Sequence, residues 1–456
     1  MRGPRRSHPS AHTRALTRRA VLTAGAWTAG AALSRAFGWS MQLPSVAGAA
    51  PHVIEAPRLF DGSALVVRDG ARVVIRNGRI DAAGAASAVP IPAGATITRV
   101  ADGTILPGLV DCHYHIESDQ ALALRQLAHG VTAFRDPGEW QEMHEPLRTL
   151  IAKEGLPGPR LFLTGPHIDG DRPAYPEDSV VARDPEEARR QVHRAVDEGA
   201  TAIKIYFRLS LACALAVIEA CRARGVPSTA HLEILDARQL FEAGLTGVEH
   251  VTSFGTSIAA PMAAERYRQA VLADNGARRD GRYALFAEAD LDGPQARRLY
   301  EVVARHRPFV DATLAVFEAQ PGDAVPKGSA ITAATRATGF ARMQALVARL
   351  HAAGARLVMG GHTEVPHAER GEAPWRELEL LVAAGVSPTE ALRAATREGA
   401  AFLGAGGAEL GAVRPGAAAD IVVVEGDPTQ AIARVRQVRA VYAAGRPVDL
   451  DRLRTR

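Results

Sequence analysis

A regular alternation of helical and extended segments in the middle of the sequence constrains the fold most. Asp184 and Pro185 mark one helix start, because Asp is a favoured N-cap and Pro is favoured at the first helical position. Repeated βα units of this kind favour a parallel sheet, and the length of 456 residues suits an α/β fold with a (β/α)8 barrel of the TIM type. The expected segments, helix and strand in turn, are 184–198, 201–207, 210–224, 226–231, 236–244 and 247–251.

Both ends of the predicted barrel are flanked by β structure without helices. Short alternating runs separated by Asp-Gly and Asn-Gly turns precede it, and similar runs follow it. We expect the two ends to fold together into one small β-sandwich domain, formed by 51–106 and 408–450, with the barrel over 107–407. The predicted strands of the small domain are 64–68, 72–76, 96–100, 419–425 and 438–443.

The apolar run 105–116 ends in two histidines, His113 and His115. Alternate residues of a strand share a face, so both imidazoles are expected to point the same way. Two imidazoles on one face can hold one metal ion, although an H-x-H pair is also an ordinary pair of polar residues at a strand exit.

Three further residues with metal-site chemistry stand in later predicted strands: Lys204, His231 and His250. In a (β/α)8 barrel the carboxyl ends of the strands build the active site, so residues scattered in sequence can converge there. Lys204 lies inside the apolar run Ala-Ile-Lys-Ile, where a buried unpaired ammonium would be costly. Its charge must therefore be removed or compensated.

The segments LPGLVDCHYH, GATAIKIYF, VPSTAH and GVEHV together resemble the metal-dependent amidohydrolase superfamily, especially its imidazolonepropionase-like and prolidase-like branch. The resemblance covers about 51–450. It implies that His113 and His115 bind one metal ion, that His231 and His250 bind a second, and that Lys204 is carboxylated and bridges both. Zinc is the expected metal for imidazole and oxygen donors. Two such ions can supply a metal-activated hydroxide that hydrolyses a carbon–nitrogen bond.

The sequence departs from this family in the eighth predicted strand. His362 stands where relatives carry an aspartate, so we expect His362 to ligate metal or to carry the proton. Asp311 and Glu364 are two other carboxylates that could compensate. Glu249 is expected to face the opposite side of its strand from His250 and to act as a partner of a ligand rather than as a ligand.

The substrate is less well defined by the sequence. Arg135, His167 and Tyr206 lie where pocket-lining residues are expected, and the segment 255–307 is long enough to form a lid. A small-molecule amide, cyclic amide or dipeptide is the expected substrate. A catalytically weakened binding protein on the same scaffold, or a lactone or phosphotriester hydrolase, is the alternative. The sequence is also compatible with a homo-oligomer.

The N-terminus has the pattern of an export signal. Arg18 and Arg19 precede a moderately apolar stretch, 20–33, and small residues follow at 47–49. Residues 1–50 are therefore predicted to be a twin-arginine leader, and the mature protein is expected in the periplasm or secreted. The apolar stretch is too short for a stable membrane span.

Composition excludes some classes of partner. The net charge is only +4, and several arginines fall within the predicted leader. No basic stripe is interleaved with aromatic residues, so nucleic-acid binding is not expected. Three cysteines without a short C-x-x-C spacing argue against a disulfide framework or a zinc knuckle.

Overall fold

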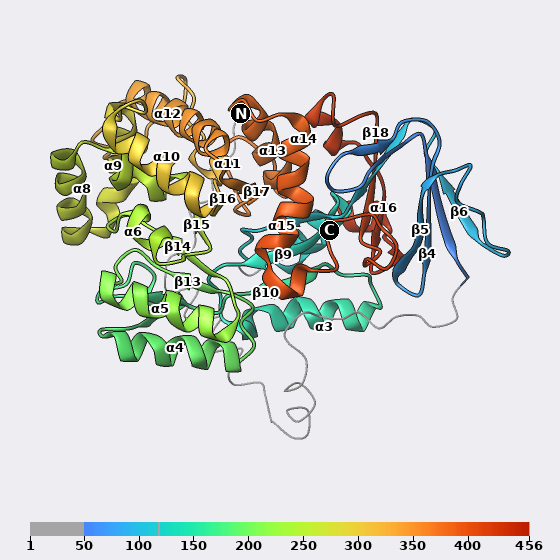
Figure 1. The fold of residues 1–456 in the computed structure, drawn as a ribbon, viewed down its shortest axis with the longest axis horizontal. Helices are drawn as coiled ribbons and strands as arrows, with labels where there is room; N and C mark the ends of the chain where they lie inside the picture. Colours follow the sequence, from blue (N-terminus) through green and yellow to red (C-terminus); the bar gives the residue numbers. More distant parts are fainter. Residues whose placement is uncertain (1–49, 117–118, 456) are drawn as a thin grey trace, which may run out of the picture.

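The computed structural model describes residues 50–116 and 119–455, and it contains an α/β domain and a smaller β region. Figure 1 shows the two side by side, with the helices α4, α5, α8 and α12 at one end of the molecule and the strands β4, β5 and β6 at the other. The predicted leader, apart from residue 50, lies outside the described residues.

The α/β domain is built on parallel strands. Two sheets, in the orders β10-β9-β8 and β12-β11-β13-β14-β15-β16-β17, contain only parallel pairs. Two backbone hydrogen bonds join segments of these sheets: Cys112 N donates to Met359 O, and Thr201 N donates to Leu163 O. An α/β fold with a parallel sheet is confirmed, consistent with a TIM-barrel-type domain. Its strands are β8 (Leu109–Asp111), β9 (Val131–Asp136), β10 (Arg160–Leu163), β11 (His167–Asp169), β12 (Ser179–Val181), β13 (Ile203–Ile205), β14 (Ser228–His231), β15 (Gly247–Glu249), β16 (Phe309–Asp311) and β17 (Arg356–Val358).

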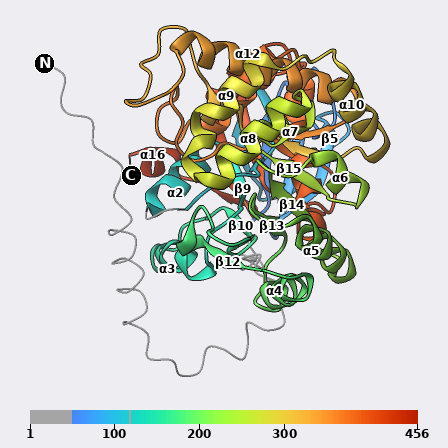
Figure 2. The ribbon, with the colours of Figure 1, turned by 90° about the vertical axis from the view of Figure 1, so that its left-hand side faces the viewer.

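Helices surround these strands, as Figure 2 shows for α3, α4, α5, α10 and α12. The predicted helix starts are confirmed, because the side chains of Asp184, Ser210 and Asp236 each accept a hydrogen bond from a backbone N–H in the first turn. The helices are α2 (Gln120–Ala128), α3 (Glu145–Glu154), α4 (Pro185–Asp197), α5 (Leu211–Arg224), α6 (Ala237–Glu242), α7 (Gly255–Ile258), α8 (Pro261–Ala273), α9 (Arg278–Glu288), α10 (Pro294–His306), α11 (Leu314–Phe317), α12 (Ala333–Ala352), α13 (Ala373–Ala383), α14 (Pro388–Arg393), α15 (Gly399–Phe402) and α16 (Leu450–Arg454).

The long segment 255–307 is helical, and its residues around the start of α9 line the main cavity. It forms α7 to α10, and Figures 1 and 2 both place α8 and α9 over one end of the strands. Helix α10 packs on α6, and its Leu299 and Val303 are fully buried. No helix in 50–116 or 119–455 is long and apolar enough to span a membrane.

The small β region unites both ends of the chain, as predicted. Strand β7 pairs antiparallel with β18, and the sheet that contains them has the order β20-β19-β18-β7-β2-β3. A second sheet has the order β5-β4-β1-β6, and Ile54 and Val73 from it share a hydrophobic core with Ile105 and Val423. The strands are β1 (His52–Ala56), β2 (Arg58–Phe60), β3 (Leu65–Val67), β4 (Ala71–Arg76), β5 (Arg79–Ala85), β6 (Thr96–Arg99), β7 (Gly103–Pro107), β18 (Ile421–Glu425), β19 (Val438–Ala443) and β20 (Arg446–Pro447).

Candidate active site

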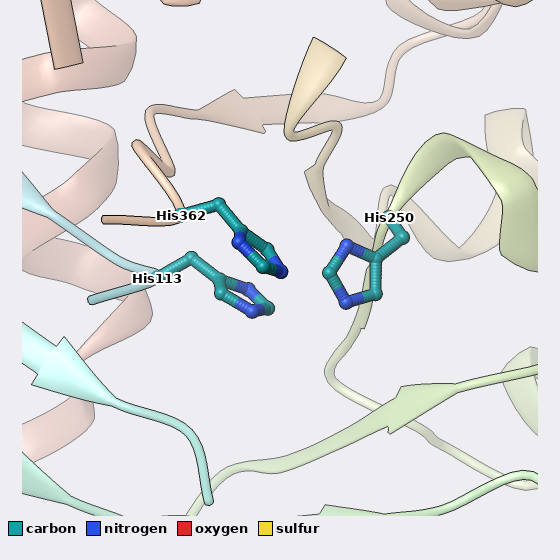
Figure 3. Close-up of side chains that lie close together, drawn as sticks. All are labelled: His113, His250 and His362. Atoms are coloured by element: carbon teal, nitrogen blue, oxygen red, sulfur yellow. The ribbon is translucent and has the colours of Figure 1, made fainter. Parts of the chain in front are cut away.

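Three imidazoles converge at the carboxyl ends of the parallel strands. His113 follows β8, His250 follows β15 and His362 follows β17, and Figure 3 shows their rings pointing toward one another. One ring nitrogen of each lies within 4.8 Å of the other two, which is close enough for one metal ion to contact all three. The sequence predicted all three residues but grouped His113 with His115. In the structure His362 belongs to the same cluster as His113.

The backbone is strained where it presents these rings. His250, Thr313, His362 and Thr363 all have positive φ angles, between 45° and 65°, which residues other than glycine rarely adopt. Such conformations cost about 1–3 kcal/mol each and persist where the surrounding structure holds them in place. Their concentration at one edge of the sheet supports a functional role for that edge.

Gly360, which follows β17, allows the backbone to approach Asp311 closely. A Cβ atom added there would lie 2.0 Å from Oδ1 of Asp311, closer than any real contact. The next residues hold the loop, because Gly361 N donates to Asp111 Oδ1 and His362 N donates to His113 O, at 2.8 and 2.7 Å. The Gly-Gly-His sequence thus brings His362 against His113.

Hydrogen-bond partners fix the orientation of His113 and His250. Nδ1 of His113 lies 2.7 Å from Oε2 of Glu249 and 3.0 Å from Oδ2 of Asp311, so this nitrogen carries a proton. Nδ1 of His250 lies 2.7 Å from the Thr313 hydroxyl. The Nε2 atom of His113 is buried and has no hydrogen-bond partner among the described residues. A metal ion would satisfy this nitrogen.

His231 is held in the same manner through its other nitrogen. Its Nε2 lies 3.0 Å from Oε1 of Glu233, and the second oxygen of Glu233 accepts a hydrogen bond from Tyr267. This leaves Nδ1 of His231 buried and without a partner in the described part of the chain. The His231 ring lies 4.4 Å from the His250 ring, centre to centre. The roles of Glu233 and Tyr267 were not predicted from the sequence, because neither residue lies in a recognisable motif.

Burial keeps most of these imidazoles neutral. It lowers the pKa of His231 to about 4 and the pKa values of His115, His250 and His362 well below the ordinary value of 6.5, with nearby positive charges contributing. His113 differs: burial alone lowers its pKa, but the Glu249 and Asp311 carboxylates raise it overall. Neutral imidazole is the form that binds a metal ion.

Lys204 lies in β13 and is almost fully buried, as its position in an apolar run predicted. Burial lowers the pKa of its amine, although the Glu249 carboxylate opposes this shift. The amine lines the same cavity as His115, His231, His250 and His362. A lysine with a lowered pKa has more of the neutral, reactive amine at neutral pH.

The site opens into a cavity of about 1080 Å³. His167 and Tyr206 line it, as expected from their positions, and the His167 ring stacks on the Tyr206 ring at 4.3 Å. His115, which was predicted to bind metal, also lines this cavity. His115 contacts the rings of His113 and His362, at 5.1 Å between centres in each case.

Arg135 does not line this cavity. It is fully buried beneath the histidines, where its guanidinium donates to Cys112 O and to Oε1 of Glu249, at 3.0 and 2.6 Å. It supports Glu249, whose pKa is held well below its ordinary value although burial raises it, because Arg135, Lys204 and His113 are close. The predicted role of Arg135 in binding substrate therefore has no geometric support.

The predicted orientation of Glu249 is wrong. β15 ends at Glu249, and the left-handed backbone of His250 breaks the alternation of a strand, so both side chains point toward His113. Of the two carboxylates that could compensate, Asp311 reaches His113, with its Oδ2 3.0 Å from Nδ1 of that ring. The Glu364 side chain is 52% exposed and lies 3.5 Å from Arg370, so it faces the surface.

Comparison with known proteins agrees with this geometry. Residues 104–448 match the Amidohydrolase family, which is most of the chain, so the protein belongs to that family. It is a hydrolytic enzyme acting on carbon–nitrogen bonds. No curated protein matches the chain.

Solved structures share the fold. A Bifidobacterium longum protein assigned as a prolidase is 25% identical, with a TM-score of 0.66 over 89% of this chain and 98% of its own. A Xaa-Pro dipeptidase with bound methionine is 19% identical, with a TM-score of 0.66 over 87% and 99%. The A. niger ochratoxinase is 20% identical, with a TM-score of 0.67 over 87% and 95%. The last two likenesses show the fold alone.

Proposed function

We propose that this protein is an exported, metal-dependent hydrolase that cleaves a carbon–nitrogen bond in a small amide, a cyclic amide or a dipeptide-like substrate. One observation carries the proposal: His113, His250 and His362 turn their ring nitrogens toward one point at the strand ends, inside a chain of the amidohydrolase family. The related structures include proteins described as a prolidase and a Xaa-Pro dipeptidase, which fits a dipeptide-like substrate.

We propose that the site holds a pair of divalent ions and that these are zinc. His113 Nε2 and His231 Nδ1, both buried and without partners among the described residues, would supply two of the donors. His115 and His250 add imidazoles, and a carboxylated Lys204 would add oxygen donors between them. Imidazole with carboxylate oxygen is a donor set that zinc accepts. When bound, the ions would polarise the substrate carbonyl and make water nucleophilic near neutral pH.

The protein's own groups orient this site. Glu249 and Asp311 hold the protonated Nδ1 of His113, while Thr313 holds Nδ1 of His250. Such partners fix the tautomer and direct the free nitrogen of each ring into the site. His362 lies in the cavity wall beside His113, where it can accept or return the proton that moves during hydrolysis.

The direct test is metal content measured together with turnover. Protein expressed with added zinc should contain close to two divalent ions per chain and hydrolyse members of a panel of small amides and dipeptides. Removing the metal with a chelator should abolish turnover, and adding zinc back should restore it. A protein without bound metal, or amide hydrolysis that survives chelation, would contradict the proposal.

Two finer features belong to the same proposal. We propose that β8, β9, β10 and β13 to β17 close into an eight-stranded barrel, and that the two sheets of the small region form a sandwich.

Export of the protein is also a proposal, which rests on Arg18 and Arg19. Replacing both by lysine should leave the folded precursor in the cytoplasm, and cell fractionation checks this. Release of the variant into the periplasm would contradict a twin-arginine signal.

A further inference from the structure

The wall of the active-site cavity opposite the histidines is rich in positive charge. Helix α9, the loop before α12 and the first turn of α12 supply five basic side chains, and the cavity is also lined by Asp280 of α9 and by Asp274, which follows α8. Asp280 is occupied, because it accepts hydrogen bonds from Ser329 and lies 3.0 Å from Arg336. Asp274 accepts from the backbone of Gly276. The basic residues are Arg278, Arg279, Arg282, Lys327 and Arg336.

Arg282 is a half-buried basic residue of this wall that has no hydrogen bond or ion pair among the described residues; Arg279 and Lys327 also have none, but both are exposed. Among the described residues no carboxylate lies within salt-bridge distance of its guanidinium, and its Nε is buried without a hydrogen-bond partner. Its guanidinium carbon lies 4.9 Å from the centre of the Phe317 ring. Its two terminal nitrogens also have no hydrogen-bond partner among the described residues and are not enclosed as Nε is, so they can donate to a ligand in the cavity.

The nearest structural explanation for this charge is Glu233. Arg282 contributes to the low pKa of Glu233, although burial of that carboxyl is the largest effect and raises it. The two oxygens of Glu233, however, are already bonded to His231 and Tyr267. Arg282 therefore acts on Glu233 only at a distance and keeps its hydrogen-bonding face available.

Arg282 also lies at a useful separation from the histidine cluster. The Phe317 ring that it covers lies 5.7 Å from the His250 ring, so one aromatic side chain separates the guanidinium from the cluster. A molecule with its scissile bond at the histidines could reach Arg282 with a group a few bonds away, since one residue of extended chain spans about 3.3–3.6 Å.

A second arginine on α9 is already held in place nearby. The guanidinium of Arg278 donates to the Tyr175 hydroxyl, at 3.0 Å, and lies 5.4 Å from the Phe207 ring. It adds positive potential to the cavity while its own hydrogen bonds are used. Arg282 is therefore the half-buried arginine of this wall whose terminal nitrogens are free to make a direct, bidentate contact with an anion.

We propose that Arg282 is a specificity-determining residue that binds an anionic group of the substrate, a carboxylate or a phosphonate-like oxyanion, a few bonds from the scissile carbon–nitrogen bond. This inference rests on the proposed hydrolase function and names the class of substrate for it. Recognition by α9 means that the segment 255–307, rather than the strand ends, sets this preference.

Binding to the intact holoenzyme tests the inference without hydrolysis. The probe is 4-oxo-5-phenylpentanoate, in which a methylene replaces the amide nitrogen, compared with its neutral alcohol and with the corresponding phosphonate. Calorimetry should give at least tenfold tighter binding of the anions than of the alcohol, because a charge-assisted hydrogen bond contributes about 1.5–3 kcal/mol and 1.4 kcal/mol is a factor of ten. The tighter of the two anions identifies the oxyanion that the cavity prefers.

Arg282→Met should remove most of that preference, by about 10–100-fold, and Arg282→Lys should restore part of it. The matched control is Arg298→Met on α10, which removes an exposed arginine outside the cavity and should leave the preference unchanged. A preference that survives in Arg282→Met would mean that the metal ions or another cation hold the anion. That result, or equal binding of acid and alcohol to the unaltered enzyme, would overturn the inference even if amides are hydrolysed.

The hydrolytic counterpart separates this inference from the proposed function. N-(phenylacetyl)glycine and its neutral amide should differ in KM, and Arg282→Met should raise KM for the acid while changing kcat little. Hydrolysis of both at equal KM leaves the enzyme proposal intact and removes the role of Arg282. Loss of all amide hydrolysis with the binding preference intact would contradict the enzyme proposal and leave the role of Arg282 in place.

Discussion

Lys204→Ala should lose bound metal and most activity. The amine lies in β13 inside the cavity, and replacing it removes a predicted bridging ligand while leaving only a small void among buried neighbours. We expect a loss of turnover larger than the roughly 10–100-fold that follows from losing an outer partner of a metal ligand. Element analysis of the purified variant, read beside its turnover, checks the prediction.

The control for this experiment is Lys153→Ala. Lys153 is exposed in the last turn of α3, so its removal should change neither metal content nor rate. Circular dichroism on both variants separates loss of metal from loss of fold. Should Lys204→Ala keep two ions and a normal rate, Lys204 is an ordinary buried lysine and the ligand set must be drawn from histidines and carboxylates alone.

The second large effect concerns His362. His362→Ala should lower turnover by about 10²–10⁴, the usual contribution of a positioned acid or base. The ring stacks on His113 at 5.0 Å between centres, so the variant removes a member of the histidine cluster as well as a proton carrier. Steady-state kinetics over a range of pH measures both, with His306→Ala, an exposed histidine at the end of α10, as the matched control.

His362→Asp separates two explanations for the histidine at this position. Aspartate tolerates the left-handed backbone found at residue 362, where φ is 58°, better than most residues. In an enzyme adapted to imidazole the variant should lose activity or shift its pH profile, because an anion would replace a neutral ring. In a weakened relative of the family it should gain hydrolysis. If neither substitution alters the rate or its pH dependence, the proton is carried by Asp311 or by water.

The parts of the site that follow from strand position could be predicted from the sequence. Lys204, His231 and Asp311 each lie in or at the end of a short strand, and the rule for barrel strands places such residues at one edge of the sheet. The two β-rich chain ends were predicted to meet for a similar reason, since neither has a helix to cover it. These predictions depend only on periodicity and order along the chain.

The remaining features depend on backbone conformations and contacts that periodicity does not encode. The Glu249 side chain was predicted to face away from His250, because an alternating strand pattern does not reveal the left-handed backbone conformation at His250. Arg135 was expected to line the pocket because of its position in a predicted strand. Its guanidinium instead donates to the buried Glu249 carboxylate. Arg282 was not predicted as a site residue, because its contact with Phe317 is between residues far apart in the sequence.

The pairing of β7 with β18 also has a consequence for the order in which the chain can fold during synthesis. The Thr104 hydroxyl donates to the Gly426 carbonyl across 322 residues of sequence, and the β18 strand itself lies near the C-terminus. At about 5–20 residues per second, the ribosome needs on the order of tens of seconds to deliver this partner. Until then the inner strands at the N-terminal end keep an open edge and an uncovered apolar face. A chain truncated before β18 would keep them exposed permanently, so residues made after the α/β domain complete the β region that begins before it.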